Sequence, residues 1–333
     1  MLWTDLVEPS ELTTVARTAF LEQEQRKQTL AQFLPNEFRM DTVIRLNVGD
    51  NGLTDAAEYR AYDAETPIAG KQGGEQITLT LPPLGQKHRV GEYDQLRMRG
   101  VNSERVLRDE IGKEVIKRAQ AIADRIELMR GQILVSGKAT ISENRFFAEN
   151  DFGRDEDMTV TAGVLWSDDS AKPLQDLEAW ADAYIDKNGE YPQFLVASSK
   201  VIRDLSKSKE FLSPNSTRGR ATLDEVNAVL QDSELPQIVR YDRRVRVNGK
   251  AVRVLDEDKL LFLPPAEANL GSTFWGTPLE SYEPGYAIQP EDRPGIAAGA
   301  YKDDDPIGVW VKASAIGLPV LADANLALAA TVR

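Results

Sequence analysis

The 333-residue chain contains no cysteine and only one histidine, His88. Without cysteine it forms neither disulfides nor thiolate metal sites. A Ser-His-Asp triad or a histidine-ligated zinc site would have to be built around His88 alone. His88 lies between Lys87 and Arg89 in the polar stretch "QKHRV". We interpret it as an exposed strand position and not as a catalytic residue.

The sequence also lacks long apolar runs, since none approaches the roughly 18 residues that span a membrane. The N-terminus has no basic region followed by an apolar core, so neither membrane insertion nor export by the usual signal is expected. Basic residues are outnumbered, because 40 lysines and arginines face 53 acids and leave a formal charge of -13. Such a charge repels nucleic acid, and sequence-specific DNA binding is not expected.

What is present is the composition of an ordinary folded protein, with 41% apolar and 28% charged residues. The length predicts two or three domains, because single cores usually stop growing below this size.

The first hundred residues are polar and poor in core-forming patterns. Residues 8–33 read as a short polar helix that ends before Pro35. Residues 45–100 show strand-like alternation in "EQITLTL" and "KHRVGEYDQLRM", separated by turn-rich pieces. A two-stranded ribbon is at best marginally stable in water. We therefore expect this segment to reach outward and to be ordered by a partner.

The clearest helix runs from about residue 103 to 135. Its apolar residues recur at spacings of three and four, which places them on one stripe. They are Val106, Ile111, Val115, Ala119, Ile122, Ile126, Met129 and Ile133. At roughly 1.5 Å per residue the helix would be about 48 Å long. The absence of a strict heptad favours a spine across a flat domain over a coiled coil.

The remainder alternates between helices and strands and predicts an α+β fold. Residues 139–166 read as two extended strands around the polar turn "FGRDED". Beyond Pro173 we expect helices over "PLQDLEAWADAYIDKNG", "SKVIRDLSKSKEFL" and "TLDEVNAVLQDS", with a buried strand at "QFLVAS". An Asn-Gly turn within 238–265 predicts a hairpin. The closing segment "IGVWVKASAIGLPVLADANLALAATV" reads as apolar strand.

The acidic stretch "RFFAENDFGRDEDMTV" raises the question of a metal or catalytic site. An EF-hand loop requires acidic or amide side chains at positions 1, 3 and 5 and glycine at 6. Placing Gly153 at position 6 puts Ala148 at position 1 and Phe152 at position 5, so the template fails. We interpret the stretch as a solvated turn between two strands. A carboxylate-based hydrolase that uses Asp151 and Asp155 stays open as an alternative.

Two further motifs fail for similar reasons. "GQILVSGKAT" resembles a phosphate-binding loop, but five residues separate its glycines where the motif has four, and Ala139 follows the lysine. We interpret it as a helix C-cap, and we expect Phe274 and Trp275 of "STFWGTP" in the core. The sequence thus predicts no catalytic, cofactor-binding or metal-ligating residue.

The basic run "RYDRRVRV" places charges on a strand. Arg240, Asp242, Arg244 and Arg246 share one face, and Tyr241, Arg243, Val245 and Val247 share the other. Such a run could bind phosphate or meet the acidic surface of a neighbouring subunit, and the sequence leaves both readings open.

Pieces spread over nearly the whole chain carry a resemblance to a known family. They are "FRMDTVIRL", "TLTLPPLGQKHRVGEYDQLRMRG", "ERVLRDEIGKEVIKRAQAIADRIELMRGQILVSGKATI", "ENDFGRDEDMTVTAGVLWSD" and "SAIGLPVLADANLALAATV". Their order resembles the Hong Kong 97 fold of tailed-bacteriophage major capsid proteins. Within that class the sequence is similar to the lambda-type family, major capsid protein E.

The resemblance implies a division of the chain and a role. Residues 1–45 would be an N-terminal arm, 46–100 an E-loop hairpin, 101–166 a peripheral domain with the spine helix, 167–300 an axial domain and 301–333 the return strands of the peripheral domain. The protein would be a non-enzymatic major capsid protein that self-assembles into hexamers and pentamers of an icosahedral phage head around double-stranded DNA. An encapsulin-like shell, with protein cargo in place of DNA, is the alternative.

The resemblance also implies partners and contacts. We expect copies of the chain itself, a separate scaffolding protein because few residues precede the arm, a portal protein and, on decorated heads, a decoration protein. No cofactor or membrane is expected, and the protein would be found in the virion after assembly in the host bacterial cytoplasm. Residues expected at subunit contacts are Lys71, Lys87, Arg89, Asp151, Asp155, Arg243 and Arg244. Lys71 would be the candidate where relatives cross-link covalently, although no partner motif is apparent.

Overall fold

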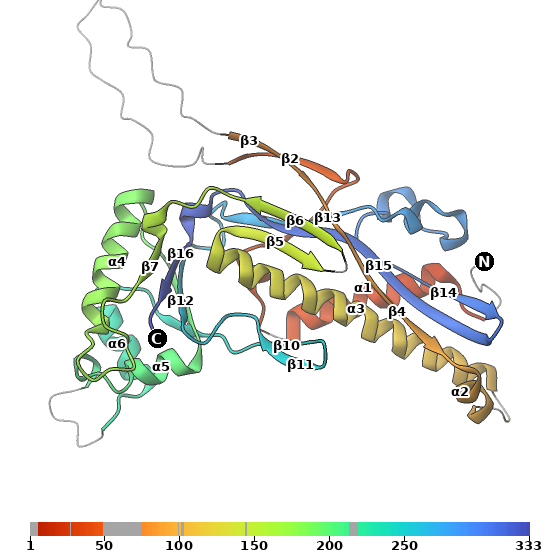
Figure 1. Cartoon of the computed structure of the whole chain (residues 1–333), viewed down its shortest axis with the longest axis horizontal. Coiled ribbons are helices and arrows are strands. Elements are labelled where there is room, and N and C mark those ends of the chain that lie inside the picture. Colours follow the sequence, from red (N-terminus) through yellow and green to blue (C-terminus); the bar gives the residue numbers. More distant parts are fainter. Residues whose placement is uncertain are drawn as a thin grey trace, which may run out of the picture.

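A computed structural model describes residues 6–26, 28–48, 75–98, 100, 103–143, 145–212 and 219–333. An elongated body carries the arm, the spine helix and a sheet around one long strand, and a compact α/β region lies at one end of it (Figure 1). The outcome is the α+β architecture that the sequence predicts.

The spine helix is α3 (Ser103–Ser136), which confirms the expected helix to within one residue. It ends at Gly137, whose positive φ of 69° suits glycine at a helix C-terminus. The arm helix α1 (Pro9–Arg26) packs along α3 and is shorter than the predicted 8–33. A separate 3₁₀ turn at Leu30–Gln32 follows it.

The elongated sheet is built around β15 (Ile307–Leu321), which confirms the predicted apolar strand. Its other members are β1 (Asn36–Phe38), β4 (Pro83–Val90), β13 (Gly271–Gly276) and β14 (Ala297–Asp304). β14 pairs with residues 307–314 of β15 and β4 pairs with residues 309–316. Because these registers overlap, β4 and β14 lie along opposite edges of β15.

The stretch "KHRVGEYDQLRM", which the sequence predicts as a strand, is a strand only up to Val90. Beyond Val90 the apolar residues Tyr93 and Leu96 are three positions apart, which is a helical spacing, and the chain there forms the short helix α2 (Glu92–Arg97). Acids in the first turn and Arg97 in the last turn favour the helix, since they complement its dipole. Upstream, β2 (Val43–Val48) and β3 (Glu75–Thr80) form a two-stranded antiparallel ribbon.

The prediction of one long strand before "FGRDED" is wrong. The chain instead folds into a hairpin of β5 (Lys138–Glu143) and β6 (Phe146–Asp151), with Arg145 at a φ of 66° beside the turn. The acidic stretch is therefore not a turn between paired strands, because the strand that follows it, β7 (Thr159–Thr161), belongs to a different sheet.

That second sheet, the compact sheet, has the strand order β7-β16-β12-β8-β9. Its remaining strands are β8 (Phe194–Ala197), β9 (Ile238–Arg240), β12 (Lys259–Leu263) and β16 (Leu328–Thr331). Helices α4 (Pro173–Asn188), α5 (Ser199–Leu205) and α6 (Leu223–Asp232) surround it, as Figure 1 shows. The three predicted helices and the strand at 194–197 are thus confirmed, although α5 ends earlier than expected. Thr222 caps α6 with a capping box.

The predicted Asn-Gly hairpin is present as β10 (Arg244–Val247) and β11 (Lys250–Arg253), which pack near the C-terminal half of α3. Short 3₁₀ turns complete the described chain, at Glu156–Met158, Lys209–Phe211, Leu279–Tyr282, Pro284–Tyr286, Pro290–Asp292 and Ala324–Leu326.

Three apolar clusters form the core. One lies between α1, α3 and the elongated sheet, one fills the compact region, and one joins the two where α3 meets the hairpin β10–β11. Phe274 and Trp275 are buried, as predicted. Among the described residues, no helix is both long and apolar enough to cross a membrane.

Candidate assembly surfaces

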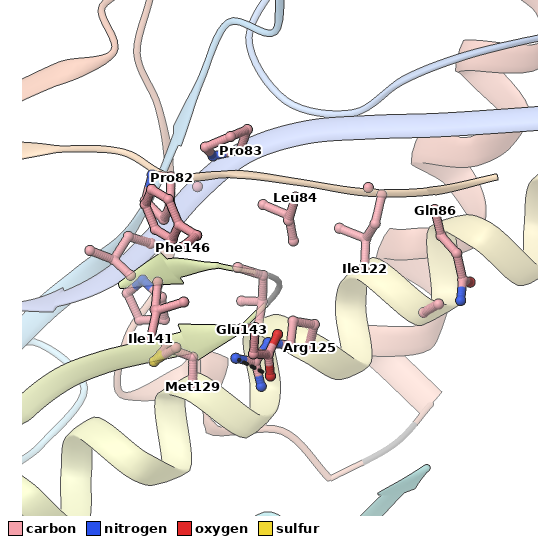
Figure 2. A pocket seen from close by; sticks show the side chains of 16 residues that line it. Pro82, Pro83, Leu84, Gln86, Ile122, Arg125, Met129, Ile141, Glu143 and Phe146 are labelled. Atoms are coloured by element: carbon pink, nitrogen blue, oxygen red, sulfur yellow. Dashed lines mark ion pairs between the residues drawn. The ribbon is translucent and has the colours of Figure 1, made fainter. Parts of the chain in front are cut away.

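The first surface is a hollow of about 440 Å³ between β4, α3 and the hairpin β5–β6. Figure 2 shows Leu84 and Gln86 of β4 on one side and Ile122 of α3 below them. Ile141 and Phe146 of the hairpin close one end. Most of the lining is apolar, and an ion pair of 3.1 Å between Arg125 and Glu143 lies on its rim.

A second hollow, of about 430 Å³, is lined by residues 83–86 of β4, which also line the first, and by Lys87. Its other walls come from Leu279 and from residues of β15 between Lys312 and Ile316. Gly85 contributes no side chain here, since a Cβ atom would lie 2.8 Å from the carbonyl oxygen of Ala313. β4 is thus flanked by open space on both sides along the same few residues.

The predicted contact residues Lys87 and Arg89 lie on β4 beyond Gln86. The Lys87 ammonium lies 4.5 Å from the centre of the Trp310 ring. One guanidinium nitrogen of Arg89 donates a hydrogen bond of 2.8 Å to the Pro306 carbonyl. Both side chains therefore make contacts within their own subunit, with Lys87 exposed and Arg89 partly exposed at its surface.

His88 faces the spine helix. Its Nε2 atom lies 3.9 Å from a carboxylate oxygen of Glu114, a buried residue that also pairs with Lys117 and Arg118. Burial opposes ionisation of Glu114, but the hydrogen bond from Lys117 and the nearby positive charges outweigh it and lower its pKa. The single histidine thus belongs to a local charge cluster, with the imidazole half exposed.

Two carboxylates of the acidic stretch, Asp151 and Asp155, form ion pairs within the subunit. Asp151 accepts a 2.6 Å contact from Lys138 across the hairpin, and the Gly153 amide donates to it at 3.0 Å. The hydrogen bond from Lys138 is the main reason that the pKa of Asp151 is lowered. Asp155 pairs with Lys187 of α4. In the described part of the chain, no three acidic or histidine side chains converge on a point that could hold a metal.

The structurally important members of that stretch are Phe152 and Arg154. Phe152 is fully buried in the joining core. The Arg154 guanidinium donates to the Val135 carbonyl at 3.0 Å and to the Ala324 carbonyl at 3.1 Å. It thereby ties the C-terminus of α3 to the turn before β16, and burial lowers the pKa of Arg154 to about 10.

A buried polar network, centred on Glu127 and Arg130 of α3, joins the arm, the spine and the compact region. Arg130 is fully buried and reaches Glu24 of the arm at 2.6 Å, Asn36 at 2.7 Å and Thr273 of β13 at 2.9 Å. Its own helix supplies Glu127 at 3.2 Å. The guanidinium is thus paired in three directions, as a buried charge requires.

Glu127 connects this network to the hairpin side. It accepts hydrogen bonds from the Tyr241 hydroxyl at 2.5 Å, the Leu30 amide at 2.8 Å and the Thr29 hydroxyl at 2.8 Å. Burial, reinforced by the negative charge of Glu127, raises the pKa of Tyr241 well above its usual value. This network was not predicted from the sequence, although Glu127 and Arg130 fall on the apolar stripe of α3. A charged side chain on a buried helix face requires a partner of opposite charge, so these two positions could have indicated it.

Arg243 belongs to the same network and is not at the surface. Its side chain is 5% exposed and pairs with Asp124 at 3.0 Å and with Glu127 at 3.4 Å. Arg243 therefore forms its ion pairs within its own subunit, and its side chain does not reach a neighbouring one as expected. Arg244, at the start of β10, is exposed. Lys71 lies outside the described residues.

Comparison with known families matches residues 12–332 to the family described as phage major capsid protein E. A search of curated proteins by sequence found no match.

Several solved structures share the fold. A protein of an Escherichia coli CFT073 prophage, assigned as its capsid protein, is 18% identical with a TM-score of 0.65, covering 96% of this chain and 99% of that one. A phage-related protein from Bordetella bronchiseptica RB50 is 16% identical with a TM-score of 0.55, covering 96% and 95%. A virus-like particle from Pyrococcus furiosus is 13% identical with a TM-score of 0.51, covering 96% and 99%. At these identities the likeness shows the fold alone.

Proposed function

The chain belongs to the phage major capsid protein E family and is a capsid shell protein, and from this premise we propose that its copies form the hexamers and pentamers of an icosahedral head around double-stranded DNA. The observation that carries the proposal is the form of the elongated body. Its sheet has long edges without a further strand in the described chain, and the ribbon β2–β3 leaves the body as only two strands (Figure 1). Such elements gain stability from neighbours.

In the proposed shell the chain divides as the family resemblance implies. The arm, residues 1–45, and the E-loop hairpin, residues 46–100, precede a peripheral domain at 101–166, an axial domain at 167–300 and return strands at 301–333. The observed sheets refine this division. β13 and β14 lie within 167–304 yet pair with β15 of the elongated sheet, and β16 returns to the compact sheet.

The contacts of the arm limit which parts of residues 1–100 are proposed to reach neighbouring copies. Its described part packs on the spine of its own subunit through α1 and the Glu24–Arg130 pair. Contacts that reach across to neighbouring copies are therefore proposed for the β2–β3 ribbon and for charges that are at least partly exposed, namely Lys87, Arg89, Asp151, Asp155 and Arg244. Heterologous contacts of this kind close into rings around rotation axes.

We propose no catalytic role. The protein acts as a structural component of the virion, assembles in the host bacterial cytoplasm and meets separate scaffolding, portal and, on decorated heads, decoration proteins. With a formal charge of -13, the shell would confine DNA without binding particular sequences.

Electron microscopy of the purified chain, expressed alone and together with its scaffolding protein, tests the proposal. We expect closed shells, tubes or rings with six-fold and five-fold capsomers. A compact monomer that persists across protein concentration, salt and scaffolding would overturn it. Particles filled with host protein and unable to take up DNA with the portal present would instead favour a cargo compartment.

A further inference from the structure

Strand β4 has the features of a site that accepts another strand. In the part of the chain that the structure describes, β4 pairs with β15 alone, so the backbone groups on its other edge have no strand partner. Its eight residues would offer an edge about 26 Å long at roughly 3.3 Å per residue. Pro83 at its start is compatible with an edge position, since proline is confined to edges, strand starts or bulges.

The two hollows beside β4 indicate the conformation of what binds there. One lies on the side of β4 that faces α3, and the other lies against Leu279 and Lys312. Both are lined by Pro83, Leu84, Gly85 and Gln86. Successive side chains of an extended strand point to opposite faces of a sheet, so one added strand would fill both hollows with alternate residues. A helix presents a single stripe and would fill only one.

Charge indicates the partner. Beyond Gln86, β4 continues with Lys87, His88 and Arg89, and Lys117 and Arg118 of α3 lie around the Glu114 that faces His88. Lysine and arginine on an exposed edge discourage indiscriminate pairing. A strand that places acidic residues opposite them would be favoured over other strands, since opposite charges stabilise cross-strand pairs. The chain itself carries a formal charge of -13 and, as a capsid shell protein, is surrounded by copies of itself.

We infer that the free edge of β4 is a strand-addition site for an extended segment of a second copy of this chain, whose alternate side chains occupy the two hollows. The inference rests on the proposed assembly and specifies one contact within it. Main-chain hydrogen bonds along β4 supply binding energy, and the hollows and basic residues select the register.

Filling one hollow tests the site. Ala121 of α3 lines the hollow that faces the spine and is only partly buried, so Ala121→Trp should occupy the space without entering the core. We expect an unchanged melting temperature and a particle yield at least about tenfold lower. Two matched controls should assemble like the parent. They are Ala121→Ser, which leaves the hollow open, and Lys113→Trp, which places the same side chain at an exposed site of the same helix.

A photo-reactive benzoylphenylalanine at Gln86 identifies the occupant. Particles assembled from equal amounts of ¹⁴N-labelled and ¹⁵N-labelled subunits should give cross-linked peptides of mixed isotope composition, and these locate the added segment. Cross-links confined to one isotope, or directed to another virion protein, would overturn the inference. Normal particles from Ala121→Trp would also overturn it and leave the proposed assembly intact, whereas failure of the parent chain to assemble would remove both.

Discussion

The elongated and compact sheets both have five strands, but they end differently. The outer strands of the compact sheet, β7 and β9, are three residues each. Two outer strands of the elongated sheet, β4 and β14, are eight residues each. Short outer strands resist pairing with other chains, whereas long ones offer a template for it. The compact sheet thus offers little edge for pairing with another chain, whereas the elongated sheet offers two long edges to which a strand of another chain could add.

The two regions also differ in what holds them together. The compact region has an apolar core with capped helices around it. Where it meets the elongated body, an apolar cluster is accompanied by the buried ions Glu127 and Arg130. Buried ion pairs contribute little net stability, but removal of one partner is costly. The junction is therefore expected to be specific in geometry and sensitive to substitution.

The largest effect is expected at the junction. Glu127→Ala leaves Arg130 with fewer partners and removes the acceptor for the Tyr241 hydroxyl and the Leu30 amide. We expect the free energy of unfolding to fall by about 3–5 kcal/mol, measured by denaturant titration. Glu110→Ala, which removes a more exposed glutamate of the same helix, should change it by less than about 0.5 kcal/mol. Similar losses for the two variants would show that the junction network is not a special link.

A core truncation in the compact region should have a comparable but local effect. Leu177 of α4 is fully buried among apolar residues of that region only. Leu177→Ala should cost about 3 kcal/mol through lost burial and a residual cavity. Hydrogen exchange should accelerate in α4 and β8 and stay unchanged in the middle of α3. In Glu127→Ala, by contrast, exchange should accelerate on both sides of the junction. Equal acceleration along α3 in Leu177→Ala would mean that the two regions unfold as one unit.

Substitution of two glycines of α3 should change the free energy of unfolding by smaller amounts and in opposite directions. A Cβ atom at Gly131 would lie 2.2 Å from the Val254 carbonyl oxygen, where the spine presses on the chain after β11. A Cβ atom at Gly112 would meet nothing within 4 Å. Gly131→Ala should destabilise by about 1–3 kcal/mol, and Gly112→Ala should stabilise by about 0.5–1 kcal/mol. Thermal denaturation of the two variants measures the signs, and equal signs would contradict the close approach at the junction.

The regular elements of both regions could be predicted from local patterns. The apolar stripe of the spine, the Asn-Gly turn at 248–249 and the caps of the compact-region helices are encoded within a few residues of each element. The misreadings arose where a local pattern was ambiguous. "EYDQLR" follows a strand directly but spaces Tyr93 and Leu96 three residues apart and forms α2, and Arg145 adopts a positive φ without being glycine.

The candidate surfaces depend on distant partners and could not be predicted in the same way. Arg243 was expected to face a neighbour because its strand neighbours are basic, but Asp124 and Glu127, more than a hundred residues away, bury it. The hollows beside β4 exist only because residues 83–86, α3 and β15 meet. The order of segments still identified the family, since it reflects the whole chain and not any single contact.

The smallest effect is expected at the exposed ion pair of the β5–β6 hairpin, on the elongated body. Asp151 and Lys138 are about half exposed, so Asp151→Asn should lower the melting temperature by no more than about 2 °C at pH 7. Millimolar Ca²⁺ should change the melting temperature of neither protein. A Ca²⁺-induced rise in melting temperature that is confined to the parent would indicate a metal site in the acidic stretch.

The pH dependence of that small difference distinguishes an ion pair from a neutral hydrogen bond. The hydrogen bond from Lys138 lowers the pKa of Asp151, and the same contact raises the pKa of Lys138. The contribution of Asp151 is therefore present above its unfolded pKa of about 4 and is lost as the pH falls through its lower folded value. The contribution of Lys138 is present below its unfolded pKa of about 10.4 and is lost as the pH rises through its higher folded value. Melting curves of the parent and Asp151→Asn should thus differ most between about pH 5 and 9 and converge on either side. Because asparagine keeps an oxygen that can accept from the Gly153 amide, a difference that persists at about pH 2 would show that the aspartate acts on the hairpin by something other than its charge.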